Sequence, residues 1–79
     1  MQEIKAFLRE YLNEVKPLNL SDEDFLNYRY LDNHLDSFGI IQFIMAIEER
    51  FNITLSAEDT ESEEFRTIKG LIEIIKSKL

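Results

Sequence analysis

The chain has 79 residues, of which 44% are hydrophobic and 32% charged, a composition typical of one small globular domain spanning residues 1–79. So short a chain excludes doubly wound and barrel folds, and a buried catalytic pocket would consume most of its core. With no cysteine and a single histidine, His34, the chain excludes disulfides, cysteine nucleophiles and thiolate or multi-histidine sites, so we expect no metal site.

The charge is strongly acidic, because nine Lys and Arg oppose sixteen Asp and Glu and leave a net charge of −7. Such a surface repels nucleic acid and anionic lipid and favours a basic partner. The most apolar stretch, residues 38–47, is about half the ~20 residues that a membrane span needs. We therefore expect a soluble, cytoplasmic, monomeric protein that neither binds nucleic acid nor inserts into membranes.

A helix is predicted over Gln2–Val15 and must end before Pro17. Its apolar residues recur three and four apart, the spacing of one buried helix face: Ile4, Phe7, Leu8, Tyr11, Leu12 and Val15.

The following stretch, residues 17–36, has no sustained period, although Ser21–Asp24 could cap a short turn. A connection this long is unusual in a small domain unless it packs against the rest of the fold. This one is rich in apolar side chains that could do so. We expect an ordered loop that packs across the helices through Phe25, Leu26, Tyr28, Tyr30 and Leu31.

An acidic connection covers Asn52–Glu64, where Ile53 and Leu55 are expected to point inward and Ser56 to cap a short helix. A last helix follows an N-cap at Thr67. With only two glycines and one proline, the chain predicts an all-α bundle of four helices, three long and one short, with a long loop between the first two. The apolar face of the last helix is Ile68, Leu71, Ile72, Ile75 and Leu79.

The helix predicted over Ser37–Phe51 is apolar on two sides. One face is the core stripe of any bundle helix: Ile40, Phe43, Ile44, Ile47 and Phe51. The opposite face carries Phe38, Ile41 and Met45, bordered by Gln42, Glu48 and Glu49. An exposed apolar strip of this kind indicates docking of a partner. The alternative is that the long loop folds over it.

Asp36 and Ser37 stand directly before this helix. Both residue types are common at helix starts, so the simplest interpretation is a cap. A phosphodiester attached to the hydroxyl would also be stabilised by the positive end of the helix. We do not expect a hydrolase triad of His34, Asp36 and Ser37, because neighbours in sequence rarely converge as a triad requires. We expect the ring of His34 to cover the helix start.

These residues together resemble the acyl carrier protein family over nearly the whole chain. The resemblance rests on Leu35-Asp36-Ser37-Phe38-Gly39 at the head of the second long helix. Further family-like positions are Ile41, Met45, Glu48, Glu49, Phe51 and the string Phe65-Arg66-Thr67-Ile68.

The resemblance implies that Ser37 carries 4′-phosphopantetheine, attached by a phosphopantetheinyl transferase, with Asp36 as the other motif residue. The protein would be a carrier and not an enzyme. It would hold an acyl or aminoacyl thioester that ligases load and transferases or synthases consume. The partner-docking face would comprise Phe38, Ile41, Gln42, Met45, Glu48 and Glu49.

The sequence departs from the pattern of many family members at two places, which bear on the cargo and on access to the serine. His34 replaces the glycine of many members, and Phe38-Gly39 after the serine resembles discrete D-alanyl carriers more than fatty-acid carriers. Large aromatic residues in the expected core favour a short or polar cargo that stays outside the bundle. The alternatives are an aminoacyl carrier of a specialised pathway and an unmodified helical adaptor.

Overall fold

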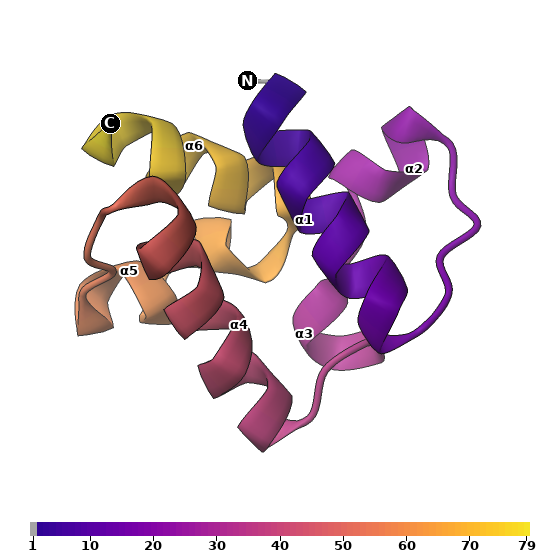
Figure 1. Cartoon of the computed structure of the whole chain (residues 1–79), viewed down its shortest axis with the longest axis horizontal. Helices are drawn as coiled ribbons and strands as arrows, with labels where there is room; N and C mark the ends of the chain where they lie inside the picture. Colours follow the sequence, from indigo (N-terminus) through magenta and orange to yellow (C-terminus); the bar gives the residue numbers. More distant parts are fainter. Residues whose placement is uncertain (1) are drawn as a thin grey trace.

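The computed structural model describes residues 2–79, which form an all-α fold (Figure 1). Its long helices are α1 (Gln2–Val15), α4 (Ser37–Phe51) and α6 (Ile68–Lys78). Shorter elements lie between them: α2 (Asp22–Leu26), α3 (Tyr30–Asn33), α5 (Ala57–Glu61) and the 3₁₀ helix η1 (Glu63–Arg66). The expected fold class and its three long helices are confirmed.

The helix boundaries follow from capping residues. The backbone of Asn52 is left-handed, with φ of 56°, and its N–H donates to the carbonyl of Glu48, which ends α4. Thr67 caps α6 by accepting a 3.2 Å hydrogen bond from the N–H of Gly70. Ser56 and Asp59 form a reciprocal capping box around α5, as the expected cap at Ser56 implied.

The connection between α1 and α4 is not the single loop that the sequence predicted, because it contains α2 and α3. Ser21 caps α2 by accepting from the N–H of Asp24 at 3.2 Å. Both short helices lie beside α1 (Figure 1). Arg9 of α1 donates to the carbonyl of Leu20, and Lys16, directly after α1, donates to the carbonyl of Asn33. The expectation that this connection is ordered and packs across the bundle is confirmed.

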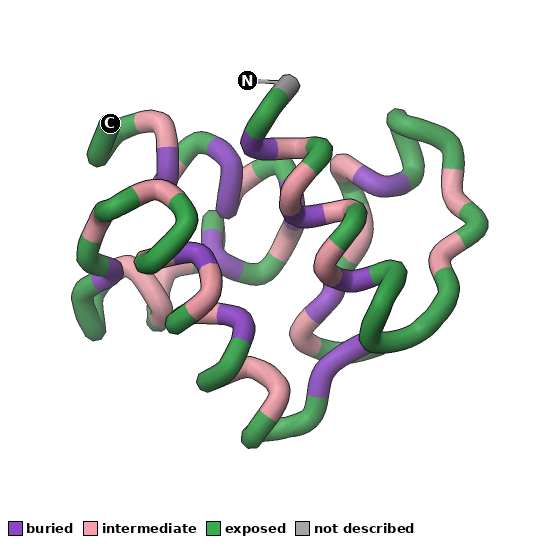
Figure 2. The backbone as a smooth tube through the Cα atoms, in the orientation of Figure 1, coloured by how far each residue is buried: buried purple, intermediate pink, exposed green. Residues whose placement is uncertain are grey.

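One hydrophobic core joins the three long helices, and Figure 2 marks their buried positions. The hydroxyl of Tyr30 donates to the carbonyl of Phe65, and no buried side-chain nitrogen or oxygen of the described residues lacks a partner. The side chains that are fully buried belong to Leu8, Leu12, Phe25, Tyr30, Phe43, Ile47, Phe65, Ile68, Leu71 and Ile75.

Gly70 lies in α6 where the backbone of η1 comes close to the helix. A Cβ atom at this position would stand 2.0 Å from the carbonyl oxygen of Glu64. The contact explains a glycine inside a helix, where glycine otherwise weakens the structure.

The two chain termini lie at the same end of the molecule (Figure 1). The first turn of α4 lies at the opposite end, at the bottom of the view. Ser37 is therefore presented on the side of the fold away from both termini.

Candidate functional site

The first turn of α4 is held by Asp36. Its backbone is extended, its carboxylate accepts from the N–H of Gly39 at 2.7 Å, and its carbonyl accepts from the N–H of Ile40 at 2.9 Å. A side chain at position 39 would crowd this cap, because a Cβ there would lie 3.0 Å from the Asp36 carboxylate oxygen. The cap makes Ser37 the first residue of a helix of 15 residues.

Ser37 differs from the other four serines in the surroundings of its hydroxyl group. Ser21 and Ser56 accept hydrogen bonds from backbone N–H groups, and the hydroxyls of Ser62 and Ser77 donate to backbone carbonyls. Ser37 is exposed, and its hydroxyl makes no hydrogen bond with any residue that the structure describes. It is the serine hydroxyl left available for modification.

The sequence predicted that the ring of His34 covers the start of α4, and this prediction is wrong. Its ring is buried, with Nε2 lying 2.6 Å from the carbonyl of Leu12 and Nδ1 2.9 Å from the hydroxyl of Tyr28. Because a carbonyl can only accept, Nε2 carries a hydrogen. Burial raises the pKa of Tyr28, which keeps its hydroxyl protonated. His34 thus ties the segment before α4 to the end of α1.

The apolar strip of α4 is exposed. Phe38, Ile41 and Met45 retain 68%, 56% and 62% of their accessible surface. The connection between α1 and α4 therefore does not cover them, which rules out the alternative interpretation. Gln42 and Glu49 are exposed beside the strip.

Glu48 is placed differently from Glu49. It is half-buried, and its carboxylate accepts a 2.8 Å hydrogen bond from the backbone N–H of Leu55. This bond holds the connection that follows α4, so Glu48 stabilises the fold whether or not it meets a partner. Sequence spacing does not reveal such a contact, because it depends on how the chain turns after Asn52.

The carboxylates of α4, Glu48 and Glu49, form no ion pair with a described residue. Within residues 2–79 the five ion pairs all lie on other elements. Arg9 and Lys5 lower the pKa of Asp22, and Lys78 together with the N–H of Ser56 lowers that of Asp59. The acidic side of α4 is thus left for an external cation.

The described part of the chain lacks two other features, a membrane-spanning helix and a cluster of metal-binding side chains. No helix there is long and apolar enough to cross a bilayer. No group of three or more His, Cys, Asp or Glu side chains there is arranged to hold a metal ion.

Comparison with known proteins identifies the family to which the chain is similar. The family described as "Phosphopantetheine attachment site" matches residues 2–75. An acyl carrier protein of Buchnera aphidicola subsp. Schizaphis graminum is 34% identical, over 99% of this chain and 96% of its own. The acyl carrier proteins of Helicobacter hepaticus and Cyanidium caldarium are 31% and 30% identical, over 96% and 100% of this chain and 92% and 85% of theirs. No solved structure matches.

Proposed function

The chain belongs to the acyl carrier protein family, and we propose that Ser37 is the residue to which its 4′-phosphopantetheine is attached. Proteins of this family carry acyl groups and are not catalysts. The observation that carries the proposal is the exposed, unbonded hydroxyl of Ser37 at the start of α4.

The surroundings of Ser37 suit a phosphodiester. The backbone N–H groups of Ser37 and Phe38 make no hydrogen bond with another described residue, and both stand at the positive end of the α4 dipole. An anionic ester on the hydroxyl is stabilised there. When attached, the group supplies the thiol that a cysteine-free chain lacks. Asp36 keeps the serine at the helix start by holding the N–H of Gly39.

Intact-mass measurement tests the attachment. After incubation with coenzyme A, Mg²⁺ and a phosphopantetheinyl transferase of broad specificity, we expect the wild type to gain the mass of one phosphopantetheine and Ser37→Ala to gain none. Ser21→Ala and Ser56→Ala are matched controls, because both also remove a hydroxyl at a helix start, and both should be modified. Labelling of Ser37→Ala, or an unmodified wild type with several transferases, would refute the assignment.

The docking face proposed for the transferase, the loading ligase and the consuming enzymes is the exposed strip of α4. Phe38, Ile41 and Met45 supply the apolar contact, and Gln42 and Glu49 border it. Glu48 contributes negative charge at the same border, while its carboxylate also holds Leu55. A basic, apolar surface on the partner fits this arrangement.

For the cargo we propose a short acyl or an aminoacyl group. Phe25, Tyr30, Phe43 and Phe65 are fully buried, and the ring of Tyr30 lies 5.4 Å from that of Phe43 and 6.0 Å from that of Phe65. Opening space for a long chain between the helices would separate these rings, which costs packing energy. A short group can remain outside the bundle.

Amide chemical shifts of the loaded protein test the cargo proposal. We expect a two-carbon acyl group to leave the core amides unchanged and a chain of about eight carbons to remain outside the core. Unloaded phosphopantetheinylated protein is the reference. Large shifts at Ile44, Ile47, Leu71 and Ile72 with the long chain alone would contradict the proposal and favour a fatty-acyl role.

A further inference from the structure

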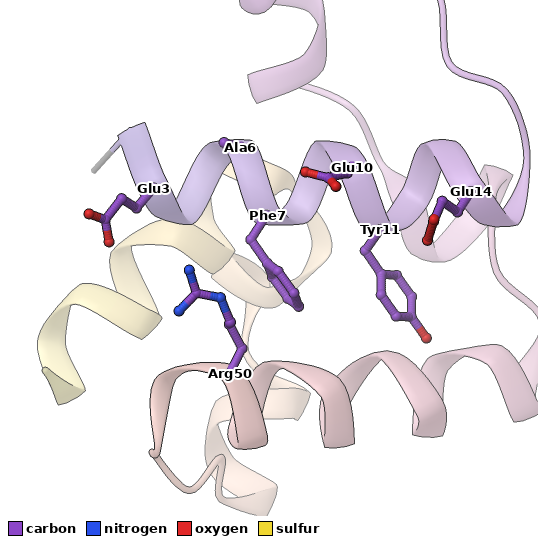
Figure 3. A pocket seen from close by; sticks show the side chains of 7 residues that line it. All are labelled: Glu3, Ala6, Phe7, Glu10, Tyr11, Glu14 and Arg50. Atoms are coloured by element: carbon purple, nitrogen blue, oxygen red, sulfur yellow. The ribbon is translucent and has the colours of Figure 1, made fainter.

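A groove lies between α1 and α4, beside the exposed strip (Figure 3). It consists of two hollows of about 380 and 550 Å³, which share Phe7, Tyr11 and Arg50 as lining residues. Met45 of the α4 strip lines the second hollow together with Ala46. We call this feature the α1–α4 groove; it continues the strip onto a second helix.

The floor of the groove is preformed. The ring of Phe7 contacts Phe51 edge to face at 5.5 Å between centroids, and the ring of Tyr11 lies 5.1 Å from that of the fully buried Phe43. Figure 3 shows Phe7 and Tyr11 extending from α1 toward α4. A ligand would therefore meet rings that are already held in place, which lowers the entropic cost of binding.

The border of the groove is acidic. Glu3, Glu10 and Glu14 line it from α1, at intervals of seven and four residues that keep them on one helix face, and Glu49 lines it from α4. None of them forms an ion pair with a described residue. The only lining cation, Arg50, stacks over Phe7 and Phe51 at 5.8 and 5.4 Å.

We propose that the α1–α4 groove binds a basic amphipathic helix of a partner protein. Its apolar side chains would lie on Phe7, Tyr11 and Met45, and its Lys or Arg side chains would pair with the glutamates of the border. The row from Glu3 to Glu14 is about 16 Å long at 1.5 Å per residue, which matches three turns of a helix. Glu10 and Glu14, which are four residues apart, repel each other, and cations of the bound helix would relieve this repulsion.

The groove binds the helix whether or not Ser37 is modified, so the experiment uses the Ser37→Ala protein. The probe is a synthetic peptide of about 14 residues, with leucines at helical spacing on one face and lysines on the other. A peptide of the same composition in scrambled order is its control. In an NMR titration we expect saturable shifts at the amides of Phe7, Tyr11 and Ala46, and much weaker ones with the scrambled peptide.

Charge-reversal variants distinguish binding in the groove from unspecific attraction to an acidic protein. Glu10→Lys with Glu14→Lys should weaken binding of the probe about tenfold. Glu23→Lys with Glu61→Lys changes the net charge equally at exposed positions outside the groove and should leave binding within about twofold. If the double variant Glu10→Lys with Glu14→Lys does not fold, Ala6→Lys serves instead, because Ala6 is exposed and lines the groove.

Several results would overturn the proposal. Shifts confined to Phe38 and Ile41 would place the helix on α4 alone, and an equal loss in both pairs of variants would indicate unspecific attraction. Concentration-dependent shifts at Phe7 without peptide would assign the groove to a second copy of the chain. If the peptide failed to bind wild-type protein after attachment of the prosthetic group, the groove would be assigned to the phosphopantetheine arm or its cargo. None of these results alters the mass test of Ser37.

Discussion

At the scale of single residues, the two glycines have different tasks although both lie in helices. Gly70 allows the backbones of α6 and η1 to meet, since a Cβ would stand 2.0 Å from the carbonyl oxygen of Glu64. At Gly39 the nearest atom to a Cβ would be a carboxylate oxygen of Asp36, at 3.0 Å. A side-chain oxygen can shift by a few tenths of an ångström, whereas two packed backbones cannot separate without disturbing the core.

We therefore predict that Gly70→Ala lowers the free energy of unfolding by about 2–3 kcal/mol, which is most of the roughly 3–5 kcal/mol available to so small a core. Gly39→Ala should change it by less than about 1 kcal/mol, because the gain in helix propensity offsets the crowding. Urea unfolding followed by circular dichroism measures both. Equal effects of the two substitutions would show that α6 can move away from η1.

Residue roles that depend on local order could be predicted from the sequence, and those that depend on distant contacts could not. Asp36 as the cap and Ser37 as the first residue of α4 could be predicted because the two residues are neighbours in the chain. The contact of His34 with Leu12 joins positions 22 residues apart. A single histidine in a sequence carries no sign of which carbonyl it will meet.

At the scale of elements, α4 is a helix with two apolar faces. Phe43 and Ile47 are buried on one face, and Phe38, Ile41 and Met45 are exposed on the other. Its period and its cap together predicted its bounds. The short helices α2 and α3 have five and four residues, too few for a period to be read, and the α1–α4 groove exists only once two helices are placed side by side.

For docking on α4, we predict that the salt dependence of binding distinguishes the contribution of charge from that of apolar contact. Glu49→Lys should slow association with a basic transferase several-fold at low ionic strength, and the deficit should shrink as the screening length falls to ~8 Å near physiological salt. Met45→Ala should weaken the complex with little salt dependence. Stopped-flow binding measures both effects.

Glu23→Lys, an exposed change of equal charge on α2, is the control and should have a smaller effect than Glu49→Lys. Glu48 is avoided because reversing it would also remove the hydrogen bond to Leu55. Unchanged kinetics of Glu49→Lys at low salt would mean that partners approach another face.

At the scale of the whole molecule, the net charge of −7 is confined to a body of 29 × 26 × 22 Å. At an ionic strength of about 0.01 M the screening length is about 30 Å, so the charges at opposite ends of the protein still repel. Five ion pairs hold some carboxylates, among them Asp22 and Asp59, whose pKa values are lowered. Most acidic groups have no such partner within the described chain.

We predict that raising NaCl from about 0.01 to 0.15 M increases the melting temperature by about 4 °C or more, roughly 1 kcal/mol for a domain of this size. The sign of the change in melting temperature shows which interaction dominates, because salt weakens both the ion pairs and the repulsion between carboxylates. If the pairs dominated, the melting temperature would fall. Differential scanning calorimetry at constant pH measures the change, and MgCl₂ at the same ionic strength would reveal any specific effect of the divalent cation.

The position of the two termini has a practical consequence for handling the protein. Because both lie at the end of the fold opposite the first turn of α4, an affinity tag, a fluorophore or a solid support joined to either terminus leaves Ser37 facing the solution. The chain can thus be immobilised on a biosensor in two ways, and a partner that recognises the start of α4 should give the same binding curve in both.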